Sequence, residues 1–248
     1  MYISSPTNDK IKFLNTLKKK SARDESGLVL LEGERIVCDC EKFGGEIVSV
    51  FYREGFEGGK ISCPESYTLA PKVFDKVSET VNSQGVIAVA KKKDVNIKEN
   101  TKNLYILCDG VQDPGNMGTI TRLCHATGAG LLTKNCTDPY SPKCTRASMG
   151  GVFAAPPVEF NEDILNFLKN EGFVFYGGIL SDKSRTLFEV EFSGKAIIVV
   201  GNEGVGISPE IQKICDEHIL IPMPGGAESL NVSVAASVMS YEFLRQVK

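Results

Sequence analysis

The alternation of short apolar runs with helix-like segments, which continues from residue 103 to the end of the chain, most constrains the fold. Runs such as NLYILCDG, FVFYGGIL and KAIIVVGNEG are mostly apolar, as expected of strands buried on both faces of a parallel sheet. Helix-like segments such as NEDILNFLKNEG lie between them. The alternation predicts an α/β fold whose mostly parallel sheet is covered by helices on both faces.

The beginning of the chain shows the same alternation on a smaller scale. LVLLEG, IVSVFY, SYTLA and VIAVA are predicted strands, and SPTNDKIKFLNTLKKK, GERIVCDCEKFGG and PKVFDKVSE are predicted helices. A lysine-rich stretch with few apolar residues follows them. We therefore expect a small α/β domain at residues 1–92, a linker at 93–102 and a second domain at 103–248.

Positive charge is concentrated in two segments of a chain whose net charge is −3. Residues 1–24 carry a net charge of +4, and residues 91–102, KKKDVNIKENTK, carry +3. Basic segments on an otherwise acidic chain are candidates for contacts to the phosphates of a nucleic acid, although a lysine run can equally be a solvated face. We single out Lys91, Lys92 and Lys93 as candidate phosphate contacts.

Several other classes of protein are disfavoured by the composition. No apolar run approaches the roughly 18 residues of a membrane span, and the N-terminus lacks the order of a signal peptide, so we expect a cytoplasmic protein without membrane contact. The eight cysteines are scattered without a C-x-x-C pair and predict reduced thiols. With only two histidines in addition, we expect no metal site.

Three glycine-rich polar loops each follow an apolar strand. They are GVQDPGNMGTITR, GNEGVGIS and PGGAESLN. Ligands of parallel α/β sheets bind at loops beyond the carboxyl ends of the strands, so the three loops together predict a single site. The phosphate-binding loop of P-loop proteins, the dinucleotide fingerprint and the nucleophile elbow of hydrolases are all absent from the sequence.

The three loops also carry a family resemblance. NMGTITR fits N-x-G-x-x-x-R, IIVVGNEGVGIS fits a G-N-E-G loop after a strand, and IPMPGGAESLNVSVAAS fits I-P-M…S-L-N-V-S-x-A. In this order they resemble the motifs of the SpoU (TrmH) family of S-adenosylmethionine-dependent RNA ribose 2′-O-methyltransferases, of the SPOUT class, over residues 103–248. Residues 1–90, with LLEGERIV, resemble the RNA substrate-binding domain of many rRNA-directed members, which is similar to ribosomal-protein-like folds.

The resemblance implies a fold, a cofactor and partners. It implies a deep trefoil knot in the second domain, a homodimer with sites near the subunit interface, and S-adenosylmethionine bound mainly by main-chain groups. The cofactor contacts that correspond to the family motifs are Gly201, Ile221 and Leu230. The implied partner is RNA, with large-subunit rRNA favoured over tRNA.

Five polar residues correspond to the catalytic positions of the family: Asn116, Arg122, Glu203, Ser229 and Asn231. Two roles remain open for Arg122, which either takes the proton of the ribose hydroxyl or acts as a cation that clamps phosphate and stabilises a developing alkoxide. Asn116, Ser229 and Asn231 stand where helices are predicted to begin, so each is also a candidate helix cap. Glu203 is expected to orient Arg122 or a group of the partner chain.

Other functions compete with an rRNA methyltransferase. The first is a tRNA 2′-O-methyltransferase, and the second is a catalytically silent RNA-binding member of the fold, against which the five intact polar residues speak. A third is a doubly wound enzyme that uses a nucleotide cofactor on small molecules, which the missing phosphate-binding loop disfavours. A fourth is the non-knotted methyltransferase fold, whose early acidic G-x-G loop is absent.

Overall fold

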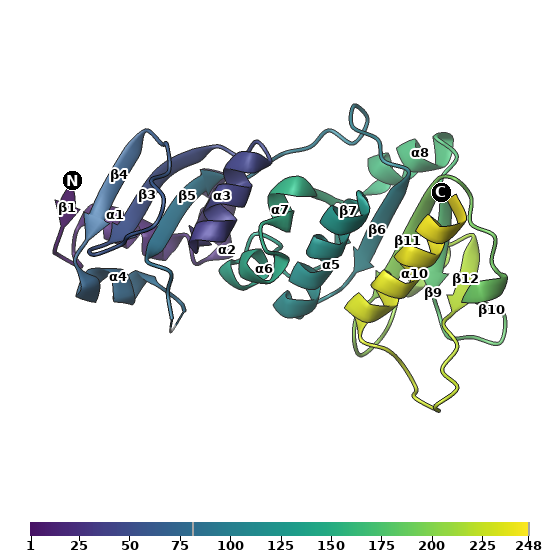
Figure 1. Cartoon of the computed structure of the whole chain (residues 1–248). Coiled ribbons are helices and arrows are strands. Elements are labelled where there is room, and N and C mark those ends of the chain that lie inside the picture. The colour runs from purple at the N-terminus through teal and green to yellow at the C-terminus, as the bar shows by residue number, and fades with distance from the viewer. Residues whose placement is uncertain (81, 248) are drawn as a thin grey trace. The chain divides into compact units, whose positions relative to one another are not determined.

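The computed structural model describes residues 1–80 and 82–247, whose elements form two compact units (Figure 1). Unit 1 consists of residues 1–93 and 138–154, and unit 2 consists of residues 94–137 and of the chain from 155 onward. The chain therefore passes from one unit to the other three times. No helix in the described part of the chain is long and apolar enough to cross a membrane.

Unit 1 is built on a mixed five-stranded sheet. In their order across the sheet, the strands are β1 (Tyr2–Ile3), β4 (Glu65–Leu69), β3 (Ile47–Arg53), β5 (Val86–Lys91) and β2 (Leu28–Glu32). β1, β4 and β3 are parallel to one another, whereas β5 is antiparallel to both of its neighbours. The helices are α1 (Asp9–Thr16), α2 (Lys20–Ser26), α3 (Glu34–Lys42), α4 (Pro71–Val77), α6 (Pro142–Ser148) and α7 (Gly151–Ala154).

Each face of this sheet has its own hydrophobic core, because successive side chains of a strand point to opposite faces. Ile87 and Val89 of β5 pack in the core that also contains apolar side chains of α1 and α4. Val86 and Ala88 pack in the opposite core, with α3 and with residues from the segment 138–154. Unit 1 is therefore a sheet between two helical layers.

The segment 138–154 packs in unit 1, although the expected boundary placed it in the second domain. Arg23 of α2 donates hydrogen bonds of 2.9 and 2.6 Å to Asp138, and both side chains are almost fully buried. Tyr140 and Phe153 contribute aromatic rings to the core beside α3. This exchange could not be predicted from the sequence, because Arg23 and Asp138 are 115 positions apart.

Unit 2 is built on a parallel seven-stranded sheet. In spatial order the strands are β10 (Arg185–Thr186), β12 (Glu217–Leu220), β9 (Val174–Gly178), β11 (Ala196–Gly201), β6 (Leu104–Asp109), β7 (Gly130–Lys134) and β8 (Pro157–Glu159). The α-helices are α5 (Pro114–Thr127), α8 (Glu162–Asn170), α9 (Pro209–Gln212) and α10 (Val232–Val247), with a 3-10 turn η1 at Leu187–Glu189.

Helices cover both faces of the parallel sheet. Leu168 of α8 and Ile211 of α9 pack with Tyr105, Leu107 and Val199 on one face. On the other face, α10 packs against α5 and β11. The expected α/β class, with a parallel sheet preceded by a small α/β domain, is confirmed.

The expected linker at residues 93–102 is held at its start and near its middle. Lys93 donates hydrogen bonds from its ammonium group to the carbonyls of Phe43 and Phe153 in unit 1. Ile97 is buried in the core of unit 2. Ile97, the one buried apolar residue of this stretch, therefore anchors in unit 2 a segment whose composition resembles that of a free linker.

Candidate active site

The loops singled out in the sequence begin at the carboxyl edge of the parallel sheet of unit 2. Asp109 at the end of β6 is in register with Gly201 at the end of the neighbouring strand β11. β12 ends at the same edge, and residues 221–231 lead from it to α10. The three loops thus lie where parallel sheets place their ligands.

Helix α5 presents the first of the predicted residues. Asp113 caps this helix, because its side chain accepts a hydrogen bond of 2.8 Å from the backbone N–H of Asn116. Pro114 occupies the first helical position, where its missing N–H costs nothing. Asn116 is therefore the third residue of the helix and not its cap, so its side-chain amide is available for other partners.

Asn116, Glu203 and Asn231 form one hydrogen-bonded chain, although they come from three different loops. The side-chain amide of Asn116 donates to Glu203 over 3.0 Å, and its carbonyl oxygen accepts from the amide of Asn231 over 2.8 Å. Asn231 in turn accepts hydrogen bonds from the backbone N–H and the hydroxyl of Ser233 at the start of α10. It thus caps α10 and orients Asn116 at the same time.

The carboxyl group of Glu203 is held in its ionised form. Partial burial by itself raises the pKa of Glu203, but hydrogen bonds from the amide of Asn116 and from the backbone N–H groups of Gln112 and Asp113 outweigh this effect. Its pKa consequently lies below the ordinary value for glutamate. Glu203 was expected to orient Arg122 or a group of a partner chain, and within this chain it accepts from Asn116 and not from Arg122.

The loop between Gly201 and Gly206 is a rigid turn. Asn202 and Gly206 exchange two backbone hydrogen bonds of 2.9 Å, while the side chain of Asn202 accepts from the N–H groups of residues 204 and 205 and donates to the carbonyl of Gly110. A Cβ atom on Gly201 would lie 2.2 Å from backbone atoms of Gly206 and Ile207. Glycine is therefore required at position 201 if this turn is to close.

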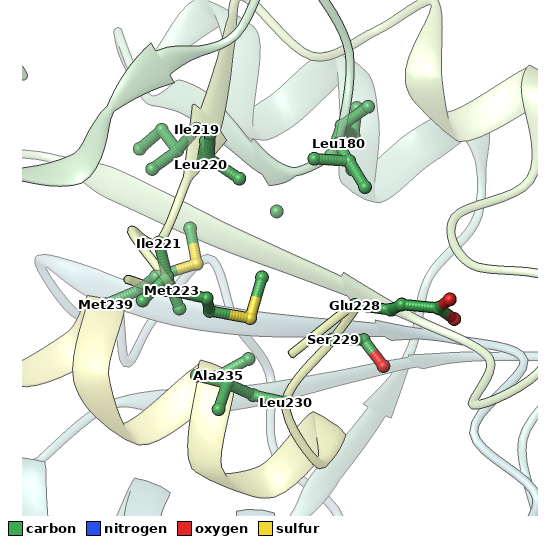
Figure 2. A pocket seen from close by; sticks show the side chains of 12 residues that line it. Leu180, Ile219, Leu220, Ile221, Met223, Glu228, Ser229, Leu230, Ala235 and Met239 are labelled. Atoms are coloured by element: carbon green, nitrogen blue, oxygen red, sulfur yellow. The ribbon is translucent and has the colours of Figure 1, made fainter. Parts of the chain in front are cut away.

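Two adjoining cavities lie beside this turn. The smaller, of about 140 Å³, is mainly apolar, and Figure 2 shows Leu180, Leu220, Ile221, Met223 and Met239 around it, with Glu228 and Ser229 on one side. The larger, of about 600 Å³, is lined by residues of the turn 201–206 and by the start of α10. Both cavities share Ser229 and Leu230, so the structure places the predicted cofactor contacts Gly201, Ile221 and Leu230 around one continuous space.

The charge of this space is negative. Glu203 and Glu228 are the charged residues in the lining of the larger cavity, and Glu228 also lines the smaller one. Among the described residues of both linings there is no lysine, arginine or histidine. The space therefore favours a ligand with a positive charge and disfavours phosphate.

Arg122 lies apart from the hydrogen-bonded residues. It is exposed on α5, six residues beyond Asn116, which corresponds to about 9 Å along a helix axis. Its guanidinium forms no hydrogen bond or ion pair with any of the residues that the structure describes. Of the five predicted catalytic residues, the structure brings Asn116, Glu203 and Asn231 together, places Ser229 beside them in the cavity lining, and leaves Arg122 outside.

The three lysines singled out as phosphate contacts already have partners in unit 1. Lys91 pairs with Glu46 at 2.8 Å, and Lys92 pairs with Asp24 at 2.6 Å. Lys93 is held by two backbone carbonyls. These contacts give the lysines a local structural role, and the prediction of phosphate binding receives no support from their geometry.

Other residues of the site were not singled out in the sequence. Asn202 shapes the turn, and the sequence contained a signal for it, since an asparagine side chain in a turn commonly accepts a hydrogen bond from the backbone two residues on. Glu228 stood in the quoted loop without an assigned role. Leu180 and Met239 belong to no motif, and only the fold brings them to the cavity.

The described residues contain no group of three or more histidine, cysteine, aspartate or glutamate side chains arranged to hold a metal ion. None of the eight cysteines, all of which lie in the described part of the chain, forms a disulfide, and four of them are buried. Burial raises the pKa of Cys40 and of Cys215 to about 12, which keeps these thiols protonated. The polar groups of the cavities are therefore carboxylate, amide, hydroxyl and main-chain groups.

Comparison with known families accounts for both parts of the chain. The family model described as the SpoU rRNA Methylase family matches residues 103–241. The model described as the MRM3-like substrate binding domain matches residues 8–88.

Individual proteins are similar over nearly the full length. The 23S rRNA (guanosine(2553)-2′-O)-methyltransferase RlmP of Bacillus subtilis (strain 168) is 32% identical, over 96% of this chain and 97% of its own. A crystal structure of an AdoMet-bound rRNA methyltransferase from Sinorhizobium meliloti is 26% identical, with a TM-score of 0.86 over 100% of this chain and 98% of that one. The SpoU methyltransferase AviRb from Streptomyces viridochromogenes, in complex with AdoMet, is 25% identical, with a TM-score of 0.86 over 96% and 98% of the two chains.

Proposed function

Because the chain belongs to the SpoU rRNA methylase family, we propose that it transfers the methyl group of S-adenosylmethionine to a ribose 2′-hydroxyl of RNA, with large-subunit rRNA as its substrate. The observation that carries this proposal is the hydrogen-bonded chain of Asn116, Glu203 and Asn231. It joins one residue from each family motif, and two of them line the larger cavity. The similar rRNA enzyme of Bacillus subtilis and the substrate-binding domain favour rRNA over tRNA.

The two cavities fit the cofactor of this family. The apolar walls at Ile221 and Leu230 suit an adenine ring, and Gly201 lets a ligand approach the main chain closely. Glu203 and Glu228 provide negative charge for a cationic ligand. When bound there, S-adenosylmethionine supplies an electrophilic methyl group on a positively charged sulfur.

The residues of the chain would position the ribose and stabilise its oxygen. One N–H of the Asn116 amide is bonded to Glu203, which leaves the second N–H for a ligand. Ser229 has no hydrogen-bond partner among the described residues and adds a hydroxyl to the lining of both cavities. Because the amide of Asn116 is held at both ends before the substrate arrives, little entropy is lost when it orients the ribose.

We assign Arg122 the role of a cation and not that of a base. A guanidinium remains protonated in proteins, and the exposed Arg122 is free of partners within the described chain. It can therefore clamp a phosphate next to the reacting ribose and stabilise negative charge on the 2′-oxygen. The negative cavity keeps phosphates outside, so the sugar hydroxyl is the part of RNA that can enter.

A homodimer would bring Arg122 to a complete site. α5 carries Arg122 on an exposed face, and the neighbouring helix α10 exposes the apolar side chains of Val234 and Tyr241, which are 46% and 56% accessible. Exposed apolar groups beside functional residues favour burial by a partner. Sedimentation at micromolar protein concentration tests this assembly, and replacement of Tyr241 by lysine should shift the species towards the monomer.

Two further features accompany the proposal. We infer a trefoil knot, since residues 221–231 lead from β12 at one side of the sheet to α10, which packs against α5 and β11. We also infer a cytoplasmic location from the similarity to the 23S rRNA methyltransferase of Bacillus subtilis.

Transfer of labelled methyl from S-adenosylmethionine to total RNA tests the function. The RNA should come from a strain that lacks the gene, and wild type should be compared with Arg122→Ala. Label in large-subunit rRNA that is lost with the variant would support the proposal. Label in tRNA would show that tRNA, and not large-subunit rRNA, is the substrate. RNA binding without any label would instead support a catalytically silent member of the fold.

A further inference from the structure

The turn between α1 and α2 carries three successive lysines, Lys18, Lys19 and Lys20. Their ammonium groups form no hydrogen bond or ion pair with any of the described residues. The nearest helical acid, Asp24, interacts with Lys20 through charge alone, because its hydrogen bond is taken by Lys92 at 2.6 Å. The lysine turn, defined as residues 18–20, thus retains its positive charge.

A buried ion pair holds the backbone of this turn. Arg23 donates hydrogen bonds of 2.8 Å to the carbonyls of Leu17 and Lys18, and its remaining nitrogens bind Asp138. Only 3% and 10% of the two side chains are accessible. Arg23 therefore neutralises Asp138 and fixes the turn, and the charge that projects into solvent belongs to the lysines.

The lysines stand at the start of α2, where positive charge destabilises a helix. Lys19 is the N-cap of α2 and Lys20 is its first residue, where the positive end of the helix dipole favours acids. The side chain of Lys19 makes no capping hydrogen bond. Residues that break a local rule without a structural gain point to a functional requirement.

We propose that the lysine turn is the phosphate-binding element of unit 1, at which the RNA backbone of the substrate is held. The proposal rests on the proposed function for the identity of the ligand as RNA. The contrast with Lys91 to Lys93 supports it, since both segments contain three successive lysines and only one of them is unpaired. Flexible ammonium groups bind the RNA backbone without sequence preference, which leaves the choice of nucleotide to unit 2.

The salt dependence of RNA binding shows whether the lysines of this turn, and not lysines elsewhere in unit 1, contact phosphates. The full-length protein, without cofactor, is titrated with an in vitro transcript of large-subunit rRNA between 50 and 200 mM salt. Lys19→Gln/Lys20→Gln is compared with Lys10→Gln/Lys91→Gln, which removes the same charge from two lysines paired with Glu65 and Glu46. Loss of two phosphate contacts should reduce the slope of log K against log salt by about 1.4, which is about sevenfold in affinity over this range.

The outcomes decide the proposal in either direction. A reduced slope for Lys19→Gln/Lys20→Gln, an unchanged slope for the control, and an unfolding temperature at or above that of wild type would support it. Equal slopes for wild type and the turn variant, or equal losses in both variants, would overturn it. The titration measures RNA binding alone and needs no methyl transfer. If the slope depends on Lys19 and Lys20 but the protein transfers no methyl group, the proposed function is contradicted while the proposal for the lysine turn still stands.

Discussion

The side-chain amide of Asn116 donates a hydrogen bond of 3.0 Å to Glu203, which lies 87 residues further along the chain. Asn231 completes the arrangement by donating to the carbonyl oxygen of the same amide. Both ends of the Asn116 side chain are thereby fixed. The orientation of the amide, and not only its presence, is set by residues of the other two loops.

Replacement of Asn116 by aspartate should uncouple these loops. The variant would set a second carboxylate against Glu203, and both the lost donor and the like charge raise the pKa of Glu203. We expect the rate of methyl transfer to fall at least about tenfold at neutral pH, with little change in cofactor affinity. The exposed Thr119→Ser on the same helix serves as the control and should retain wild-type activity.

The same variant predicts a change in pH dependence. In wild type the pKa of Glu203 is below its ordinary value, so the group stays ionised at neutral pH and adds no pH dependence there. In Asn116→Asp the raised pKa means that acidification protonates one carboxyl and relieves the repulsion. Activity relative to wild type should therefore rise as the pH is lowered from 8 to 6, and a flat ratio would show that the two carboxylates do not interact.

Glu228 should distinguish the cofactor from its product. The carboxylate lines both cavities, and the positive sulfur of S-adenosylmethionine is neutral in S-adenosylhomocysteine. Glu228→Gln should weaken S-adenosylmethionine about fivefold in calorimetry and leave S-adenosylhomocysteine unchanged. Glu191→Gln, an exposed acid outside both linings, is the control. Equal weakening of both ligands would place the interaction at another group of the cofactor.

Gly201 should tolerate no side chain. Its Cβ atom would lie 2.2 Å from two backbone atoms across the turn, whereas a Cβ on Gly204 would meet only the side chain of Asn202 at 3.5 Å. We expect Gly201→Ala to lose about 1–3 kcal/mol of stability and to lose cofactor binding. Gly204→Ala should remain near wild type in thermal unfolding and in cofactor titration. Similar behaviour of the two variants would mean that the turn can open.

Glu32 should make unit 1 sensitive to acid. Burial raises the pKa of this carboxyl, but hydrogen bonds from Ser78, Thr80 and the backbone of Glu79, together with the charge of Arg146, lower it below the ordinary value. A carboxyl group whose pKa is lower in the folded protein than in the unfolded chain stabilises the fold at pH values above its ordinary pKa. This stabilisation is lost as the pH falls through the lowered pKa.

Denaturant unfolding at pH 7 and at lower pH values measures this contribution. Glu32→Gln should be less stable than wild type at pH 7, and the difference should shrink as the solution is acidified below about pH 4. The exposed Glu46→Gln is the matched control and should change little at any pH. A difference between Glu32→Gln and wild type that is independent of pH would show that charge is not the cause.

Much of the fold could be predicted because its signals are local. The strands β6, β9 and β11 appear in the sequence as continuous apolar runs, and the helix α8 appears as an amphipathic segment with helical period. The family resemblance, the α/β class, the cofactor and the enzyme class are confirmed by the family models and the similar structures. The short elements β1, β10 and α2 were missed, because two to seven residues show no clear period.

The remaining features depend on contacts between distant residues. Arg23 and Asp138 are far apart in the sequence, so nothing in either segment predicts their burial together. The lysines at 18–20 and at 91–93 are identical in composition, and only their partners distinguish them. The candidate residues of the site came from motif order, but the partner of Glu203 required the structure, and their catalytic roles stay predictions until they are measured.

The most direct test of the account locates the transferred methyl group. Large-subunit rRNA from a strain lacking the gene is incubated with the protein and labelled S-adenosylmethionine, and then hydrolysed with alkali. A methylated 2′-oxygen cannot attack the adjacent phosphate, so the account predicts label in an alkali-resistant dinucleotide with wild type and none with Arg122→Ala. Label in mononucleotides, which would place the methyl on a base, or no label from protein that binds both RNA and cofactor, would contradict it.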